Sequence, residues 1–325
     1  MSLPELSFRF FRNSTYINCF KREYVRYFST TNLLCASEVA ESTGKDVTPV
    51  KMAYTSHEST KGPAEANSLP IIIMHGLLGS RNNWVSLSKA LHNLTLRKII
   101  TVDARNHGDS PHNSEMSYHH LAEDVRALME NLNIPKASLI GHSMGGRAMM
   151  LAALKYPTLV ENLVVVDISP VGNSPSLNVM KSYFEAMKNI KLEHNIPLSA
   201  ARKAVDEQLR STIKEQMLRL FLATNLVEDN GSFRWRVNLE AISENFFSNI
   251  AIFPISAPPS ISYKGPTLFV CGEKSDYVRA EDHSQIKEYF PNAVFKYIPD
   301  AGHWVHADKP HEFLDIVFQF IQETS

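Results

Sequence analysis

Short runs of apolar residues recur along the chain, and segments with a helical pattern separate them. Residues 69–74 read Leu-Pro-Ile-Ile-Ile-Met without a polar position, which is typical of a strand buried on both faces of a parallel sheet. Between such runs, apolar residues spaced three and four apart predict helices. Alternating strands and helices predict a doubly wound, mostly parallel α/β sheet. Similar runs lie at 98–102, 139–140, 163–166, 267–270 and 294–298.

The buried-strand runs stop between residues 171 and 259. An all-helical insert within such a sheet predicts a cap over the edge where α/β proteins bind ligands. The alternative is a second domain with its own core, but the position of the insert before the late strands favours the cap. We therefore assign 49–170 and 260–325 to the core and 171–259 to a helical cap. The helical patterns of the insert lie at 179–190, 199–210, 213–225 and 238–252.

The first 28 residues differ from the rest in composition, because basic side chains outnumber Glu5 and Glu23 and aromatic and hydroxyl residues lie between them. This composition is typical of an organelle transit peptide. The segment Arg26-Tyr27-Phe28-Ser29 resembles the site of the mitochondrial matrix peptidase, with cleavage after Phe28. We predict a mitochondrial transit peptide over 1–28 and a linker over 29–48. The alternative is a basic tail with no targeting role.

Composition narrows the class of protein. The chain has 325 residues and a formal net charge of -1, which argues against nucleic acid or an anionic membrane as the main partner. Its three cysteines, Cys19, Cys35 and Cys271, are scattered, so they predict neither a disulfide framework nor a metal site. No apolar stretch reaches the roughly 18 residues that a membrane-spanning helix needs. We expect no transmembrane segment.

The segment Gly141-His142-Ser143-Met144-Gly145 carries the clearest chemistry. It follows an apolar run and opens a helical pattern, the context in which Gly-x-Ser-x-Gly forms a nucleophile elbow. The sharp turn leaves no room for side chains two residues before and after the serine, and the helix N-terminus favours developing negative charge. Ser143 is therefore the candidate nucleophile, provided that the chain supplies its partners.

Two further loops follow predicted strands. His75-Gly76-Leu77 comes after the run at 69–74, and a turn there would let the amides of Leu77 and Met144 form an oxyanion hole. We interpret His75 as a structural residue of this loop.

Near the C-terminus, His303 follows Gly302 and the last predicted strand. A histidine on a loop there can reach Ser143, and the order serine then histidine is that of the α/β-hydrolase triad. His306 is the competing candidate, and Gly302 favours His303.

Together these motifs resemble the α/β-hydrolase superfamily, and further the mitochondrial alpha/beta-hydrolase domain-containing protein 11 group and its bacterial esterase relatives. The resemblance runs from about residue 49 to the C-terminus and includes Trp235-Arg-Val-Asn-Leu-Glu in the cap. It implies the α/β-hydrolase fold, serine esterase activity on apolar acyl esters such as diacylglycerol, a matrix location, and association with the 2-oxoglutarate dehydrogenase complex. The motifs are His75-Gly-Leu-Leu-Gly, Asp103-Ala-Arg-Asn-His-Gly-Asp-Ser, Gly141-His-Ser-Met-Gly-Gly, Val166-Asp-Ile-Ser-Pro and Ala301-Gly-His-Trp.

The triad acid has three candidates. Many relatives carry it after the strand that follows the cap, in a Gly-x-x-Asp pattern, but this chain has Ser275 there and Asp276 one residue late. Asp167 ends the run at 163–166, at the sheet edge expected for Ser143, and the resembling group uses that position. Glu240 lies in the cap, and a mobile lid would orient a histidine poorly. We favour Asp167 over Asp276.

The sequence and the resemblance together predict a serine hydrolase that cleaves carboxylic esters, of the lipid or acylglycerol type, in mitochondria through an acyl-enzyme, without a cofactor or metal. A dehalogenase or epoxide hydrolase of this fold would need an aspartate where Ser143 stands. Two alternatives stay open. One is an acyltransferase that passes the same acyl group to an alcohol or thiol. The other is a protein whose main role is to bind and protect a lipoylated 2-oxoacid dehydrogenase complex.

Overall fold

A computed structural model describes residues 47–58, 68–172, 174–255, 259 and 261–325. The predicted transit peptide at 1–28 and most of the predicted linker lie outside these residues. The predicted core and cap segments lie within a single unit over Val47–Ser325.

A seven-stranded sheet forms the centre of this unit, in the order β1-β3-β2-β4-β5-β8-β9. Only the edge strand β1 runs antiparallel, against β3, and the other neighbours are parallel. The carboxyl ends of the parallel strands therefore meet at one edge, where α/β proteins bind ligands. The strands are β1 (Tyr54–His57), β2 (Ile71–Met74), β3 (Ile99–Val102), β4 (Ala137–His142), β5 (Val160–Val166), β8 (Thr267–Gly272) and β9 (Ala293–Ile298).

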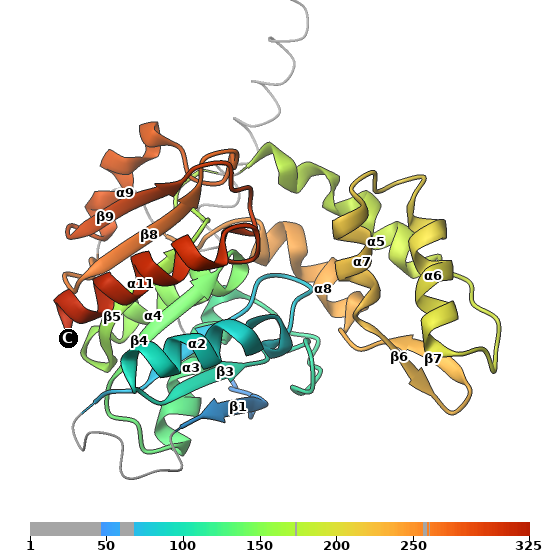
Figure 1. Ribbon diagram of the computed structural model, residues 1–325, viewed down its shortest axis with the longest axis horizontal. Helices are drawn as coiled ribbons and strands as arrows, with labels where there is room; N and C mark the ends of the chain where they lie inside the picture. Colours follow the sequence, from blue (N-terminus) through green and yellow to red (C-terminus); the bar gives the residue numbers. More distant parts are fainter. Residues whose placement is uncertain (1–46, 59–67, 173, 256–258, 260) are drawn as a thin grey trace, which may run out of the picture. The chain divides into compact units, whose positions relative to one another are not determined.

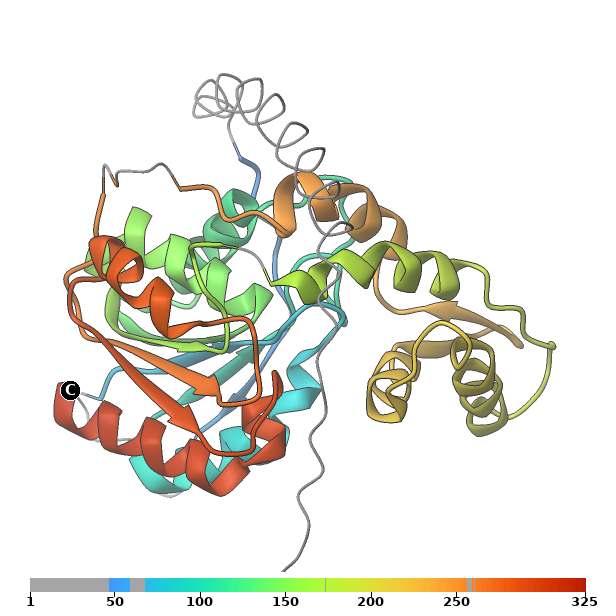
Figure 2. The same ribbon diagram turned by 90° about the horizontal axis from the view of Figure 1, so that it is seen from above.

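Helices cover both faces of the sheet, and Figures 1 and 2 show the sheet between these two layers. Alternate residues of β2 face opposite layers: Ile72 and Met74 pack with α3 and α4, whereas Ile71 and Ile73 pack with α2 and α11. The central strands are buried on both sides, so the uninterrupted apolar runs follow from the fold. The helices are α2 (Val85–Thr95), α3 (Tyr118–Asn131), α4 (Met144–Lys155), α9 (His283–Tyr289), α10 (Val305–Asp308) and α11 (Pro310–Thr324).

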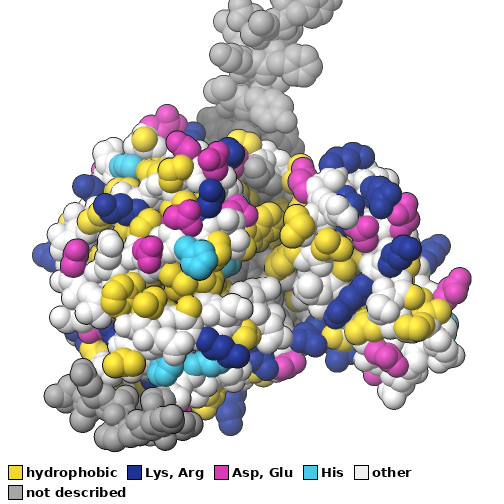
Figure 3. All heavy atoms as spheres, viewed as in Figure 1, with side chains coloured by type: hydrophobic (Ala, Val, Ile, Leu, Met, Phe, Trp, Pro, Cys, Tyr) yellow, Lys and Arg dark blue, Asp and Glu magenta, His cyan; other side chains and the backbone are white. Residues whose placement is uncertain are grey.

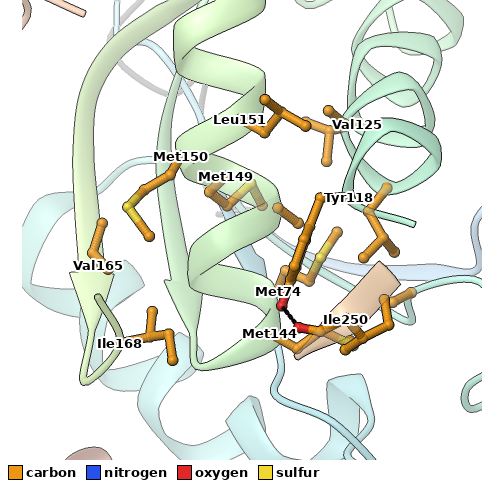
Figure 4. Packing of buried hydrophobic residues seen from close by; sticks show 14 of the residues in the cluster. Met74, Tyr118, Val125, Met144, Met149, Met150, Leu151, Val165, Ile168 and Ile250 are labelled. Atoms are coloured by element: carbon orange, nitrogen blue, oxygen red, sulfur yellow. Dashed lines mark hydrogen bonds between the residues drawn. The ribbon is translucent and has the colours of Figure 1, made fainter. Parts of the chain in front are cut away.

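Helix α4, which begins directly after Ser143, is buried over nearly its whole length. Figure 4 shows Met150 beside Val165 of β5 and Leu151 beside Val125 of α3. Such close packing on several sides leaves little freedom for the helix, because a tightly packed interior resists displacement. The base of the nucleophile turn is therefore rigid.

The cap departs from the all-helical prediction. Residues 226–235 form a hairpin, β6 (Leu226–Asp229) and β7 (Ser232–Trp235), where the sequence analysis expects no strand. Asn230 and Gly231 between them have positive φ values of 52° and 77°, the conformation that an Asn-Gly hairpin turn requires. The rest of the cap is helical, with α5 (Met180–Lys188), α6 (Leu198–Leu209), α7 (Gln216–Ala223), α8 (Leu239–Asn245) and a π-helical turn, η5 (Phe246–Ile250).

Among the described residues, no helix is long and apolar enough to cross a membrane. The same part of the chain contains no cluster of three or more His, Cys, Asp or Glu side chains arranged to hold a metal ion.

Candidate active site

Ser143 lies on the turn between β4 and α4 in a strained conformation, with φ 52° and ψ -117°. The two flanking glycines are needed for close packing. A Cβ on Gly141 would lie 2.3 Å from the Gly145 carbonyl oxygen, and one on Gly145 would lie 2.5 Å from the His75 carbonyl oxygen. The Ser143 amide also donates to the Val166 carbonyl at 3.0 Å. The local sequence thus forces the strained turn that a nucleophile elbow requires.

Three side chains form a hydrogen-bonded line at the carboxyl edge of the sheet. The Ser143 hydroxyl donates to His303 Nε2 at 3.0 Å, and His303 Nδ1–H donates to Asp167 Oδ2 at 2.7 Å. Asp167 is fully buried, whereas the His303 side chain is 19% exposed. The carbonyl of His303 accepts a further hydrogen bond from His142 Nε2 at 2.9 Å. The structure therefore brings together the three residues that the sequence analysis favours.

The loop after β8 supports both Asp167 and His303. The Gly272 amide donates to Asp167 Oδ1 at 2.9 Å, and the Ser275 hydroxyl donates to Oδ2. The Tyr277 ring stacks on His303, with centroids 3.8 Å apart and planes 17° apart. Burial, then the charges of Asp276 and Asp167, raises the pKa of Tyr277 to about 12, so the ring is a neutral phenol at physiological pH.

The competing candidates lie elsewhere. Asp276 accepts a hydrogen bond from the Ser174 hydroxyl at 2.7 Å. Glu240 pairs with Lys188 at 2.8 Å on the exposed surface of the cap. The His306 ring is buried and stacks on Trp84 at 4.3 Å, and burial lowers its pKa to about 3.

The loop after β2 lies against the elbow. A Cβ on Gly76 would come within 3.3 Å of the Ser143 Cβ. His75 donates from Nδ1 to the Gly76 carbonyl at 2.7 Å and accepts from the Ala104 amide at 3.1 Å, which fits the structural role expected for it. In the described part of the chain, no protein group accepts a hydrogen bond from the Leu77 or Met144 amide. Both amides are thus available to an oxyanion.

A cavity of about 140 Å³ adjoins the elbow where the cap meets the core. The cap contributes Phe221 to its wall, and Trp304, which follows His303, contacts Phe221 with ring centroids 5.9 Å apart. Its remaining wall combines the loops that carry Leu77 and His303. The lining residues are His75, Gly76, Leu77, Gly79, Asn83, Trp84, His142, Phe221, Trp304, His306 and Ala307.

Tyr277 is not predicted from the sequence, and Ser275 stands out there only because it displaces the expected aspartate. A hydroxyl residue at that point of the loop is a weak signal that the acid comes from another strand. No local pattern indicates that Tyr277 stacks on His303, because the two residues lie on loops after different strands.

A family model described as the alpha/beta hydrolase fold matches residues 70–310. The chain belongs to the α/β-hydrolase family. A mouse α/β hydrolase named sn-1-specific diacylglycerol lipase ABHD11 is 43% identical over 287 residues, covering 88% of this chain and 90% of that protein. A solved structure of a marine microorganism esterase superposes with a TM-score of 0.74 at 34% identity, covering 83% of this chain and 99% of the other.

A more distant relative is ethanol acetyltransferase 1 of Cyberlindnera fabianii, which is 26% identical over 314 residues, 90% of this chain and 92% of that protein. The predicted fold is confirmed by the family match and by the topology of the sheet. The predicted class of enzyme, a carboxylic ester hydrolase, is also confirmed.

Proposed function

We propose that this chain is a serine hydrolase that cleaves esters of apolar acyl chains, of the diacylglycerol type, through an acyl-enzyme. The observation that carries the proposal is the line from Ser143 through His303 to Asp167, with hydrogen bonds of 3.0 and 2.7 Å. A nucleophile bonded to a base, and a base bonded to a buried acid, is the arrangement that activates a serine hydroxyl.

The reaction proceeds in two steps. His303 Nε2 takes the proton of Ser143 as the hydroxyl attacks the ester carbonyl, and Asp167 stabilises the imidazolium that forms. The Leu77 and Met144 amides donate to the oxyanion, and His303 then gives its proton to the departing alcohol. Water, deprotonated by His303, attacks the acyl-enzyme, and His303 returns this proton to the Ser143 oxygen as the acid leaves. Removing one oxyanion donor typically costs about 10²–10³ in rate.

Two observations support an apolar substrate. The mouse relative bears the name of a diacylglycerol lipase, and the cap carries exposed apolar side chains such as Met217 and Leu220 on α7. Figure 3 shows hydrophobic side chains gathered on the part of the cap that faces the core. An acyl chain gains about 0.8 kcal/mol for each methylene group that it buries, so such a surface favours longer chains.

The test uses purified protein, a panel of glycerides and short esters, and a fluorophosphonate probe. We expect wild-type protein to hydrolyse esters and to be labelled, and Ser143→Ala to do neither while staying folded. Ser88→Ala is the matched control, because Ser88 is a buried serine on α2 whose hydroxyl, among the described residues, bonds to the Val85 carbonyl and to no catalytic residue. Hydrolysis by Ser143→Ala in a contaminant-free preparation would disprove the serine mechanism.

An acyltransferase is the second candidate, and the relationship to ethanol acetyltransferase 1 favours it. Both activities share the acyl-enzyme and differ in the group that attacks it. Adding ethanol or glycerol to the hydrolysis assay separates them. A new ester formed faster than free acid at a modest alcohol concentration would identify the transferase, whereas unchanged acid release would exclude it.

We further propose a mitochondrial matrix location and association with the 2-oxoglutarate dehydrogenase complex. The location is supported by the basic composition of residues 1–28 and by the segment Arg26-Tyr27-Phe28-Ser29. A mature N-terminus near Ser29 on protein from purified mitochondria is the expected result, and an intact Met1 end there would contradict it. Co-purification of the dehydrogenase complex with tagged protein tests the association.

A further inference from the structure

Arg147 connects the nucleophile helix to both chain segments that join the core to the cap. It lies four residues after Ser143 on α4 and is buried. The outgoing segment, residues 168–172, leads from the core into the cap, and the guanidinium donates to its carbonyls of Ser169 at 3.0 Å and Gly172 at 3.2 Å. The returning segment, residues 250–255, leads back to the core, and the guanidinium donates to its carbonyl of Ala251 at 2.7 Å. One side chain thus bridges two segments that are about eighty residues apart in the sequence.

Arginine suits this position because its planar guanidinium carries five N–H donors in a fixed fork. A lysine keeps the charge, but its single ammonium group cannot span carbonyls on two segments in the same geometry. Loss of the fork would leave buried carbonyls without partners, which is costly in itself. The bridge therefore depends on the shape of the group and not only on its charge.

The two bridged segments lead directly into the walls of the cap. The outgoing segment continues into α5, and the returning segment begins at the last residue of η5. Phe184 of α5 and Phe246 of η5 contact each other, with ring centroids 5.3 Å apart. The Tyr118 hydroxyl of α3 adds a hydrogen bond of 2.7 Å to the Ile250 carbonyl on the same returning segment. The base of the cap is consequently tied to the helix that carries the nucleophile.

Other polar contacts join the cap to the loops of the core. Asn225 donates to the carbonyl of Leu78, next to the proposed oxyanion donor, at 2.7 Å. The backbone N–H of Asn238 donates to the backbone carbonyl of Asn106 at 2.9 Å. Both residues belong to the second half of the cap, between the two segments that Arg147 bridges, so the cap contacts the core at several points.

We propose that Arg147 is a positioning residue that fixes the cap relative to Ser143 and thereby sets the acyl-chain length that the enzyme prefers. The proposal rests on the ester-hydrolase function proposed above. A short acyl group needs only the elbow, the oxyanion donors and His303. A long chain must also contact the cap, so only the long chain depends on where the cap lies.

The experiment compares kcat/KM for p-nitrophenyl acetate and p-nitrophenyl decanoate in Arg147→Met and Arg147→Lys. We expect the decanoate-to-acetate ratio to fall by about tenfold in both variants, the effect of losing contact with about two methylene groups. The acetate kcat should stay within a few-fold of wild type. If charge alone mattered, Arg147→Lys would keep the wild-type ratio, and that result would overturn the bridging role.

Arg97→Met is the matched control. Arg97 is also buried, but it bonds to Ser138 and Glu161 at the start of the strands, at the opposite edge of the sheet. Its loss should lower stability without changing the ratio. Tyr118→Phe removes one hydrogen bond to the returning segment and keeps the ring, so it provides a milder test if Arg147→Met fails to fold. We expect a smaller fall in the ratio for Tyr118→Phe.

Hydrogen exchange gives an independent readout. Amides in 168–172 and 250–255 should exchange faster in both Arg147 variants than in Arg97→Met, while the elbow helix stays protected. An unchanged ratio in Arg147→Lys and Tyr118→Phe, or equal losses on both esters, would overturn the proposal. A wild-type protein that hydrolyses neither ester would instead disprove the proposed function, so the two failures are distinguishable.

Discussion

Ser275 donates a hydrogen bond to the same carboxylate oxygen of Asp167 that accepts one from His303. The other oxygen of Asp167 accepts from the Gly272 amide at 2.9 Å. The acid therefore follows β5, but the groups that orient it follow β8, the neighbouring strand. A buried carboxylate with three donors is held in one orientation.

The identity of the acid can be tested by two isosteric substitutions. We expect Asp167→Asn to lower kcat by about 10⁴, since the amide no longer fixes the histidine tautomer or stabilises the imidazolium. Asp276→Asn should cost only a few-fold, because Asp276 bonds to Ser174 and not to His303. The reverse order, measured with one ester on folded proteins, would assign the acid to the later loop.

Ser275 should matter to a smaller degree than Asp167. Removing its hydroxyl by Ser275→Ala leaves the Gly272 amide in place and takes away one donor to a buried charge. Such a bond contributes about 1.5–3 kcal/mol, so we expect kcat to fall by at least about tenfold. Ser275→Thr keeps the hydroxyl and should retain most of the activity. Ser174→Ala, which removes the neighbouring serine–aspartate bond, is the control and should have little effect on kcat.

Much of this architecture follows from local sequence. The run Ile71–Met74 is buried on both faces, and the elbow is sterically dictated by Gly141 and Gly145. These features depend on neighbouring residues, so they can be predicted. The β6–β7 hairpin is harder to predict, because its short strands lie partly exposed within a helical region. The Asn230-Gly231 pair is the local signal for it.

The choice among Asp167, Asp276 and Glu240 could not be made from local pattern alone. It depends on how the loops after β5, β8 and β9 meet in space, which a linear pattern does not specify. A Cβ on Gly272 would lie 2.2 Å from the Gly302 carbonyl oxygen, so the loops that carry Ser275 and His303 pack directly against each other. This long-range contact determines which carboxylate reaches His303.

Buried histidines should make the folded state sensitive to acid. Burial is the main cause that lowers the pKa of His75 to about 4 and those of His107 and His306 to about 3. Between pH 6.5 and these values the unfolded chain binds protons that the folded chain does not, so stability falls as the pH falls. Each group contributes up to about 1.4 kcal/mol per pH unit.

Chemical denaturation between pH 7 and pH 5 measures this dependence. His306→Phe should reduce the slope of the free energy of unfolding against pH by about one proton below pH 6. The substitution keeps a ring against Trp84 and removes a buried Nδ1 that has no hydrogen-bond partner among the described residues. An unchanged slope would mean that His306 is not buried as a neutral group.

The position of Ser275 also predicts that the triad acid can be moved. The hydroxyl of Ser275 already bonds to the oxygen that faces His303, so a carboxylate at position 275 would lie next to His303 Nδ1. Asp167 has a φ of 51°, a conformation that asparagine tolerates better than most residues. The double variant Asp167→Asn/Ser275→Asp should therefore fold, and its kcat should be at least about tenfold higher than that of Asp167→Asn.

The matched control is Asp167→Asn/Ser275→Asn, which has the same shape without the charge, and its kcat should be no higher than that of Asp167→Asn. Equal kcat values for the two double variants would show that a carboxylate at position 275 cannot orient His303.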